Sequence, residues 1–410
     1  VIEMPGDNSS FTNTGSIDVG RLDVHDGVFN QNGSLAGSLR LYGNVQYNHN
    51  TGDFDTADNS LVLGSYHAMG AIFDATGTLH NAPGRTIDMT YSSIRCPVIN
   101  EGTIVTQAGR GSSQSITGAF SNEPGSLLWL KSTWAYGSGS LRITDGFTNH
   151  GAIQIWSWTD ASYSPTLTIE NGTLVNAPDG IIDFSGSGAA SILHADVENQ
   201  GTIRVDHGRY ATIDRMEHNS GTINIEDGYL RLDQVGDPPS LTNTGDVEVA
   251  QGALLLIASS TYEQTEGTTT VHGSLTAPAL NFHGGLLSGT GSLSGPVMLD
   301  GDAIHSPGAS PGIQTVTGTY DLLDNATLII ELAGTGGVAG VDHDFVDVSG
   351  DVTLDGFLDV QLFGGFEPPI DSTYDVLTGT TILANGLEII PSNYSYEIVP
   401  GGNGELLRLT

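Results

Sequence analysis

The first residues that could do chemistry are the aspartates of the segment 52–58. Asp53, Asp55 and Asp58 carry carboxylate oxygens, the ligands that Ca²⁺ prefers, at a spacing that could wrap around one ion. The glycine and the final glutamate of an EF-hand loop are absent. A second acidic group with the same chemistry lies at 342–347. The sequence therefore predicts calcium as its one candidate cofactor, bound by Asp53, Asp55 and Asp58.

Tryptophans are the second candidates, because an indole ring on a protein surface can stack on a sugar or pack against another subunit. In a strand that alternates inward and outward residues after a glycine, every second position faces solvent. Trp156 stands five residues after Gly151, at an outward position, whereas Trp129 stands four residues after Gly125, which predicts a core position. We therefore expect Trp156 to be a ligand-binding residue, unless an insertion loop covers it.

Residues suited to catalysis are scarce. Lys131 is the single lysine among 12 basic residues, which is a thin supply for a polysaccharide lyase. The chain has no adjacent Asp-Asp pair for acid-catalysed hydrolysis, no convincing nucleophile elbow, and only scattered histidines. We predict that the protein is not an enzyme, with polysaccharide degradation as the least favoured alternative. The single cysteine, Cys96, excludes an intramolecular disulfide.

The charge balance narrows the class of partner. The chain has 12 Lys and Arg residues against 47 Asp and Glu residues, for a formal net charge of −35. Nucleic-acid binding and docking on anionic lipid both need a basic surface, so we predict neither. No apolar run approaches the roughly 18 residues of a membrane helix, so we also expect no direct membrane insertion.

A repeated phrase organises most of the chain. It reads Asn-x-Gly, with apolar residues two and four positions after the glycine, as in Gly201-Thr202-Ile203-Arg204-Val205. This period of two indicates a half-buried β-strand. A second glycine often follows after seven residues, as Gly252 follows Gly245, and begins another alternating pair. The first glycine recurs every 18 to 29 residues, at Gly84, Gly102, Gly125, Gly151, Gly180, Gly201, Gly221 and Gly245.

These patterns predict an all-β fold, a right-handed parallel β-helix (β-solenoid) rod in which insertions fall in the turns between coils. A glycine at a fixed offset suits a corner with positive φ, and asparagine tolerates such a turn too. Stacked coils would also align the asparagines into a hydrogen-bonded ladder. The rival fold is an array of β-sandwiches, but Asn-Gly hairpin turns are scarce, with Asn32-Gly33 and Asn171-Gly172 the main candidates.

From Tyr262 onward the sequence pattern changes. Gly284-Gly285 is followed by Gly289-Thr290-Gly291, and then by Ser306-Pro307-Gly308-Ala309-Ser310-Pro311-Gly312. This part, over residues 240–410, closely resembles the C-terminal part of secreted bacterial β-solenoids of the autotransporter-passenger-like type. We therefore divide the chain into repeated coils with loop insertions at 1–261 and an autotransporter-passenger-like β-solenoid segment at 262–410.

The resemblance implies an exported bacterial protein with an extracellular or cell-surface location. The family spans adhesins, proteases, toxins and structural proteins, so the fold alone does not assign a function. It also implies a membrane-embedded translocator or a sorting tail, and neither follows Thr410 in this sequence. We expect such parts to have been removed, or the chain to be released without them.

Both ends of the chain are strand-like and resemble no capping helix. The open edges of a parallel solenoid offer unpaired backbone groups to another chain. We therefore predict an extracellular structural protein, the subunit of a homopolymeric fibre or matrix that assembles end to end. The interface residues would be Val1, Ile2, Glu3, Leu406, Leu407 and Leu409. The alternative is a surface adhesin or glycan-binding rod that uses outward loops such as 43–70 and 131–140.

Overall fold

The computed structural model describes residues 2–3, 9–57, 60–64, 70–107, 114–133, 137–158, 163–206, 209–234, 240–308, 310–402 and 404–410. Within these ranges the chain forms strands and turns only. The described residues therefore contain no helix that could cross a membrane. The chain divides into two compact units, Val1–Arg215 and Met216–Thr410, and each is described by itself. The boundary predicted between residues 261 and 262 rests on a change of sequence pattern and falls inside the second unit, so it stays a prediction.

The first unit contains the strands β1 (Ile2–Glu3), β2 (Ser10–Asn13), β3 (Ile17–Gln31), β4 (Leu35–His49), β5 (Phe54–Asp55), β6 (Leu61–Leu63), β7 (Ala71–Ala75), β8 (Leu79–Asn81), β9 (Thr86–Met89), β10 (Ser92–Ile94), β11 (Val98–Asn100), β12 (Thr103–Thr106), β13 (Gln114–Ile116), β14 (Phe120–Asn122), β15 (Leu127–Ser132), β16 (Ser140–Asn149), β17 (Ala152–Ser157), β18 (Thr166–Asn176), β19 (Ile181–Gly186), β20 (Ser191–Asn199) and β21 (Thr202–Val205). The chain passes from the first unit to the second within β22 (Arg209–Asn219).

The second unit continues with β23 (Thr222–Ile225), β24 (Gly228–Leu232), β25 (Leu241–Asn243), β26 (Asp246–Val249), β27 (Leu254–Ile257), β28 (Tyr262–Gln264), β29 (Thr268–Val271), β30 (Ser274–Thr276), β31 (Leu280–Phe282), β32 (Leu286–Gly289), β33 (Ser292–Ser294), β34 (Val297–Leu299), β35 (Ile304–Pro307), β36 (Ile313–Thr317), β37 (Tyr320–Leu322), β38 (Thr327–Leu332), β39 (Phe345–Val348), β40 (Val352–Leu354), β41 (Phe357–Leu362), β42 (Tyr374–Gly379), β43 (Ile382–Leu383), β44 (Glu388–Ile390), β45 (Tyr396–Pro400) and β46 (Glu405–Leu409).

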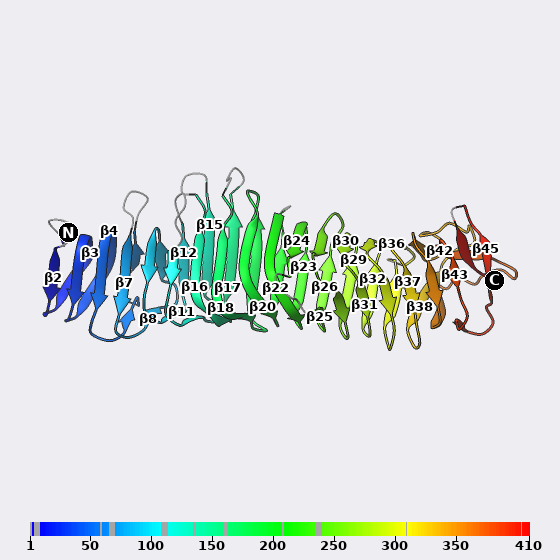
Figure 1. Ribbon diagram of the computed structural model, residues 1–410, viewed down its shortest axis with the longest axis horizontal. Helices are drawn as coiled ribbons and strands as arrows, with labels where there is room; N and C mark the ends of the chain where they lie inside the picture. Colours follow the sequence, from blue (N-terminus) through cyan, green and yellow to red (C-terminus); the bar gives the residue numbers. More distant parts are fainter. Residues whose placement is uncertain are drawn as a thin grey trace. The chain divides into compact units, whose positions relative to one another are not determined.

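Each unit is a parallel β-solenoid, as the repeats predicted. Many strands pair in parallel with the strand three places further along the chain, so that β8 pairs with β11 and β11 with β14. Between β15 and β21 the step is two places, because the long strands β16, β18 and β20 each take the place of two shorter ones. In the second unit β29 pairs with β32 and β32 with β35, again at a step of three places. One coil therefore has three strands, and successive coils stack strand on strand (Figure 1). The sequence pattern showed two of the three strands, because the third is only three residues long in coils such as that of β11.

Alternating burial fills the interior of each coil. In β21 the side chains of Ile203 and Val205 are fully buried, while Thr202 and Arg204 point outward. The next coil repeats this pattern with Ile223 and Ile225 in β23. Apolar burial at roughly 25 cal/mol per Å² is the main force that holds such coils together. The period-two pattern therefore gives a dry core and a polar exterior along every face.

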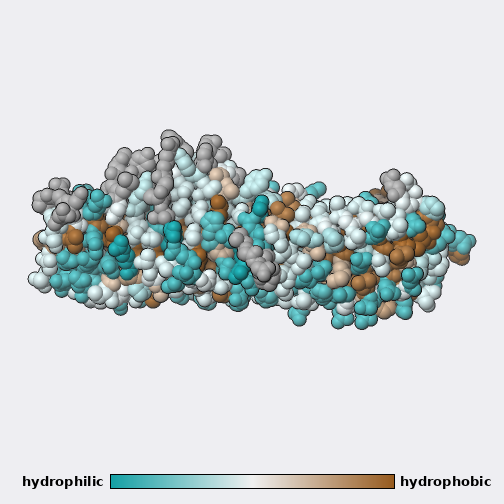
Figure 2. Space-filling model, in the orientation of Figure 1, coloured by the Kyte–Doolittle hydropathy of each residue, from teal (hydrophilic) through white to brown (hydrophobic). Residues whose placement is uncertain are grey.

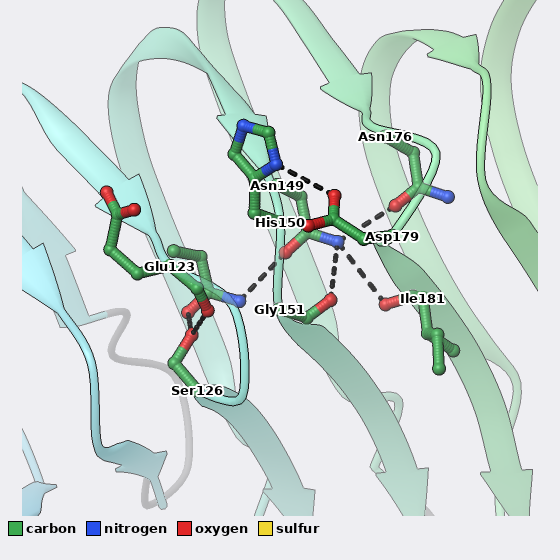
Figure 3. A network of polar contacts seen from close by, with 9 residues as sticks. Glu123, Ser126, Asn149, His150, Gly151, Asn176, Asp179 and Ile181 are labelled. Atoms are coloured by element: carbon green, nitrogen blue, oxygen red, sulfur yellow. Dashed lines mark hydrogen bonds and ion pairs between the residues drawn. The ribbon is translucent and has the colours of Figure 1, made fainter. Parts of the chain in front are cut away.

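Asparagine side chains form the buried ladder that stacked coils suggested. In the first unit the Nδ2 of each asparagine donates to the Oδ1 of the asparagine one coil further on, over 2.6 to 2.8 Å. The members are Asn81, Asn100, Asn122, Asn149, Asn176 and Asn199, all fully buried. Figure 3 shows Asn149 accepting from the preceding coil and donating to Asn176, with Gly151 O also 3.1 Å from its amide. A second run joins Asn219, Asn243 and Gln264.

The ladder explains the repeated asparagine better than a left-handed turn does. None of the asparagines in the described ranges has a positive φ angle. Each ladder amide instead donates and accepts within the dry interior, so no buried polar group is left without a partner along the run. The left-handed conformation expected for these asparagines is therefore wrong, whereas the ladder predicted beside it is confirmed.

Glycine is required at the first and at the second position of a repeat such as that of Gly201 or Gly245–Gly252 for different physical reasons. Gly252, the second glycine of its repeat, has a φ angle of 85°, as a left-handed corner requires. Gly201, the first glycine of its repeat, does not have such an angle. A Cβ atom there would lie only 2.2 Å from the carbonyl oxygen of Ala177, in the preceding coil. Gly201 is therefore needed because two backbones approach closely, whereas Gly84 and Gly125, which begin earlier repeats, do turn through positive φ, at 73° and 80°.

Candidate functional site

One outward face of the first unit gathers aromatic, basic and acidic side chains. It is formed by β15, β17, β19 and β21, which pair in parallel and in register. The pairing stacks Trp129 on Gln154, Gln154 on Asp183, and Asp183 on Arg204, so four successive coils contribute one column of side chains. The adjacent column contains Lys131, Trp156 and Ser185. Parallel register thus brings together residues that are far apart in the sequence.

Three tryptophans lie beside one another on this face. The ring centroids of Trp129 and Trp156 are 6.1 Å apart, and those of Trp156 and Trp158 are 5.5 Å apart, both in edge-to-face geometry. The ammonium of Lys131 lies 4.6 Å from the centroid of Trp129 and 5.7 Å from that of Trp156. Trp158 keeps 47% of its surface exposed. We call these three rings and Lys131 the tryptophan platform, an amphipathic surface open to solvent.

The outward position predicted for Trp156 agrees with the structure, whereas the core position predicted for Trp129 is wrong. Trp129 is an outward, half-buried residue of β15. The register pairs Thr103 with Leu127, so Ser126 takes the place that Gly102 has one coil earlier. Gly125 lies one residue before this equivalent position. Counting from Gly125 therefore exchanges the predicted inward and outward residues throughout the strand.

A groove of about 360 Å³ lies next to the tryptophan platform. Its lining includes the rings of Trp156 and Trp158 and the polar side chains of Gln154, Asp183, Ser185, Arg204 and Asp206. This volume is within the range of small-molecule sites, and aromatic walls with a few fixed polar groups are typical of them. We call this space the platform groove.

Hydrogen bonds hold the acidic wall of the groove in place. Asp183 is only 5% exposed although it points outward. Its Oδ1 accepts from Arg204 Nε at 2.9 Å, and its Oδ2 accepts from Gln154 Nε2 at 3.0 Å and from Ser185 Oγ at 2.8 Å. Arg204 also lies 3.7 Å from Asp206 through Nη2 and Oδ2. The network crosses three coils, so the polar groups are positioned before any ligand arrives.

Sequence reasoning found only one wall of this groove. Asp183 and Arg204 were missed, although each stands three residues after the first glycine of its repeat, as Gln154 does. Equal offsets from equivalent glycines would have placed all three in one outward column. The distance between them along the chain, 29 residues from Gln154 to Asp183, hides that relation because insertions change the coil length.

The predicted calcium ligands serve the backbone in this structure. The Oδ1 of Asp53 accepts from the amide of Thr78 at 2.8 Å, and that of Asp55 from the amide of Ala57 at 2.7 Å. Asp58 lies outside the described residues. In the described ranges no three His, Cys, Asp or Glu side chains are grouped to hold a metal ion. Calcium at Asp53, Asp55 and Asp58 stays a prediction.

The second acidic group, at 342–347, also holds loops together. Asp344 is fully buried and accepts from the amides of Gly312 and Glu331 at 2.7 and 2.9 Å. Its loss of hydration raises the pKa of this carboxyl to about 7, because burial disfavours the charged form. Asp344 thereby ties Gly312 to β38, which is a structural role.

The predicted interface residues at the N-terminus lie in the first coil. Ile2 and Glu3 form β1 and pair in parallel with Val24 and His25 of β3, while Val1 lies outside the described residues. Beside them Phe11 of β2 stacks on Phe29, with ring centroids 5.1 Å apart, and remains 41% exposed. In the described part of the chain, β1 and β2 pair with β3 alone. Their second edges have no strand partner there.

The predicted interface residues at the other end do not form an open edge. Leu406, Leu407 and Leu409 belong to β46, which pairs antiparallel with β42 on one side and with β45 on the other. Leu407 and Leu409 are fully buried. The expectation of unpaired backbone groups in this strand is therefore corrected, because the chain folds back and covers both of its edges. Figure 2 shows apolar residues gathered near the C-terminal end of the chain. The exposed apolar residues of the second unit include Leu362, Phe363, Ile370, Leu383 and Ile390.

Comparison of the chain with protein-family models and with curated protein sequences gives no significant match. The function is therefore inferred from the geometry of the tryptophan platform and the platform groove.

Proposed function

We propose that this chain is an extracellular or cell-surface β-solenoid that binds a glycan in the platform groove. The single observation that supports this function is the tryptophan platform, three neighbouring rings beside a groove with fixed polar groups. Sugar rings present an apolar C–H face and a rim of hydroxyl groups. Tryptophan rings cover the first, while carboxylate, amide and hydroxyl groups such as those of Asp183, Gln154 and Ser185 bond the second.

The geometry favours binding over catalysis. Both oxygens of Asp183 accept hydrogen bonds from within the protein, so a proton transfer by this carboxyl would disrupt the wall of the groove. A binding site has no such conflict, because it requires that the polar groups stay where they are. We therefore retain the proposal that the protein is not an enzyme.

Binding to a glycan array followed by titration calorimetry tests this function. We expect Trp156→Ala to weaken binding of the best glycan at least about fivefold, because a lost stacking contact removes roughly 1 kcal/mol or more. Phe363→Ala is the matched control, since it removes an aromatic ring that is 44% exposed and belongs to the second unit. Equal binding by both variants, or no glycan bound at all, would overturn the proposal.

A second candidate is the structural fibre, and one observation favours it. The rings of Phe11, Phe29, Tyr47 and Phe73 stack from coil to coil with centroids 5.1 to 5.6 Å apart, and Phe11 at the end of this column is 41% exposed. A second copy of the chain could continue both the stack and the β1 and β2 edges. Electron microscopy at high protein concentration would then show filaments that Phe11→Asp prevents, whereas single particles in the unaltered protein would refute this candidate.

A further inference from the structure

The charged side chains around the platform groove affect whether it binds a neutral or an acidic glycan. Two carboxylates, Asp183 and Asp206, line the groove, and each forms an ion pair with Arg204. Asp183 and Asp206 are 5% and 8% exposed, whereas the Arg204 side chain is 43% exposed. Carboxylates this deeply placed are screened little by salt, so they act on a ligand at short range. The formal charge of these three groups together is negative.

Both cations near the groove are already engaged with protein groups. Arg204 makes a hydrogen-bonded ion pair with Asp183 at 2.9 Å and a longer one with Asp206 at 3.7 Å. Lys131 lies over the rings of Trp129 and Trp156. Its charge also acts on Asp88, a carboxylate two coils before Trp129 in the same column. An anionic ligand would have to compete with these partners for each cation.

We infer that the platform groove selects uncharged sugars over acidic ones, an inference that rests on the proposed glycan-binding function. A uronic or sulfated sugar in the groove would bring its anion beside Asp183 and Asp206. The net charge of −35 on the chain adds a long-range repulsion of the same sign. A neutral hexose or N-acetylhexosamine meets neither penalty, and its hydroxyls can donate to the carboxylates. The ligand class is therefore a neutral polysaccharide.

Titration calorimetry on the full chain with matched oligosaccharides tests this selectivity. The probes are neutral hexaoses and the same hexaoses oxidised to carboxylates at C6. We expect the neutral member of a pair to bind at least tenfold more tightly in low salt. Only the part of this ratio that comes from the long-range net charge should shrink as salt rises, because the buried carboxylates are screened little. Asp206→Asn should reduce that ratio at least threefold. Asp359→Asn, which changes the net charge equally but lies in the second unit, should leave the ratio unchanged.

The outcomes separate the two proposals. An acidic hexaose that binds as tightly as its neutral partner, and loses binding in Trp156→Ala, overturns the selectivity while the glycan-binding function stands. The absence of binding by every hexaose overturns both. Melting temperatures of the variants are measured alongside, and Asp206→Glu provides a second variant that keeps the charge and should keep the ratio if Asp206→Asn does not fold.

Discussion

Replacing Asn149 by leucine is expected to lower the free energy of unfolding by about 3 kcal/mol, because it removes one member from the middle of a buried hydrogen-bonded ladder. The Nδ2 of Asn122 would lose its acceptor at 2.8 Å and keep only the longer bond to Ala152 O at 3.2 Å, and the Oδ1 of Asn176 would lose its donor at 2.8 Å. Both groups are fully buried, so water cannot replace the lost partner. Leucine has the same branched heavy-atom skeleton as asparagine with bulkier terminal groups, so the substitution leaves no cavity.

Urea denaturation followed by circular dichroism measures this change. Asn50→Leu is the matched control, because Asn50 also bonds the asparagine of a neighbouring coil, Asn32, at 2.7 Å but in an exposed position. We expect the control to cost less than about 0.5 kcal/mol, as surface substitutions usually do. Similar losses in the two variants would mean that burial of the ladder adds nothing to its strength.

Replacing Gly201 by alanine is expected to destabilise the protein by about 3 kcal/mol, the upper part of the range for overpacking. The added Cβ would lie 2.2 Å from the carbonyl oxygen of Ala177 and 2.3 Å from that of Gly180. Both contacts are with backbone atoms of the preceding coil, which also receive or flank the hydrogen bonds between coils. The coils would have to separate at this corner to admit one methyl group.

Gly20→Ala provides the control for the general effect of losing a glycine. A Cβ at Gly20 would have no atom within 4 Å, and its φ angle lies outside the positive range. We expect this variant to be unchanged or more stable by up to about 1 kcal/mol, because alanine restricts the unfolded chain. A melting temperature of Gly201→Ala equal to that of Gly20→Ala would show that the corner can relax, contrary to the close approach described above.

Gly201 and Asn149 also show how far the repeat pattern predicts the structural role of an individual residue. The pattern predicted a corner with positive φ at Gly201, which is wrong, and a hydrogen-bonded ladder at repeated asparagines such as Asn149, which is confirmed. It could not distinguish a glycine needed for positive φ from one needed for backbone approach. The difference depends on atoms one coil away, which a local pattern does not contain.

The amino-acid sequence by itself determined the all-β class, the parallel coils and the side that most residues face, because a period of two is a local property of the chain. It also placed Trp156 outward. The tertiary structure decided which coil positions meet, because turns of unequal length set the register, as Gly125 and Ser126 show for Trp129. It alone brought Asp183 and Arg204 to the tryptophan platform and covered both edges of β46, since neighbours across coils are chosen by backbone pairing and not by distance along the chain.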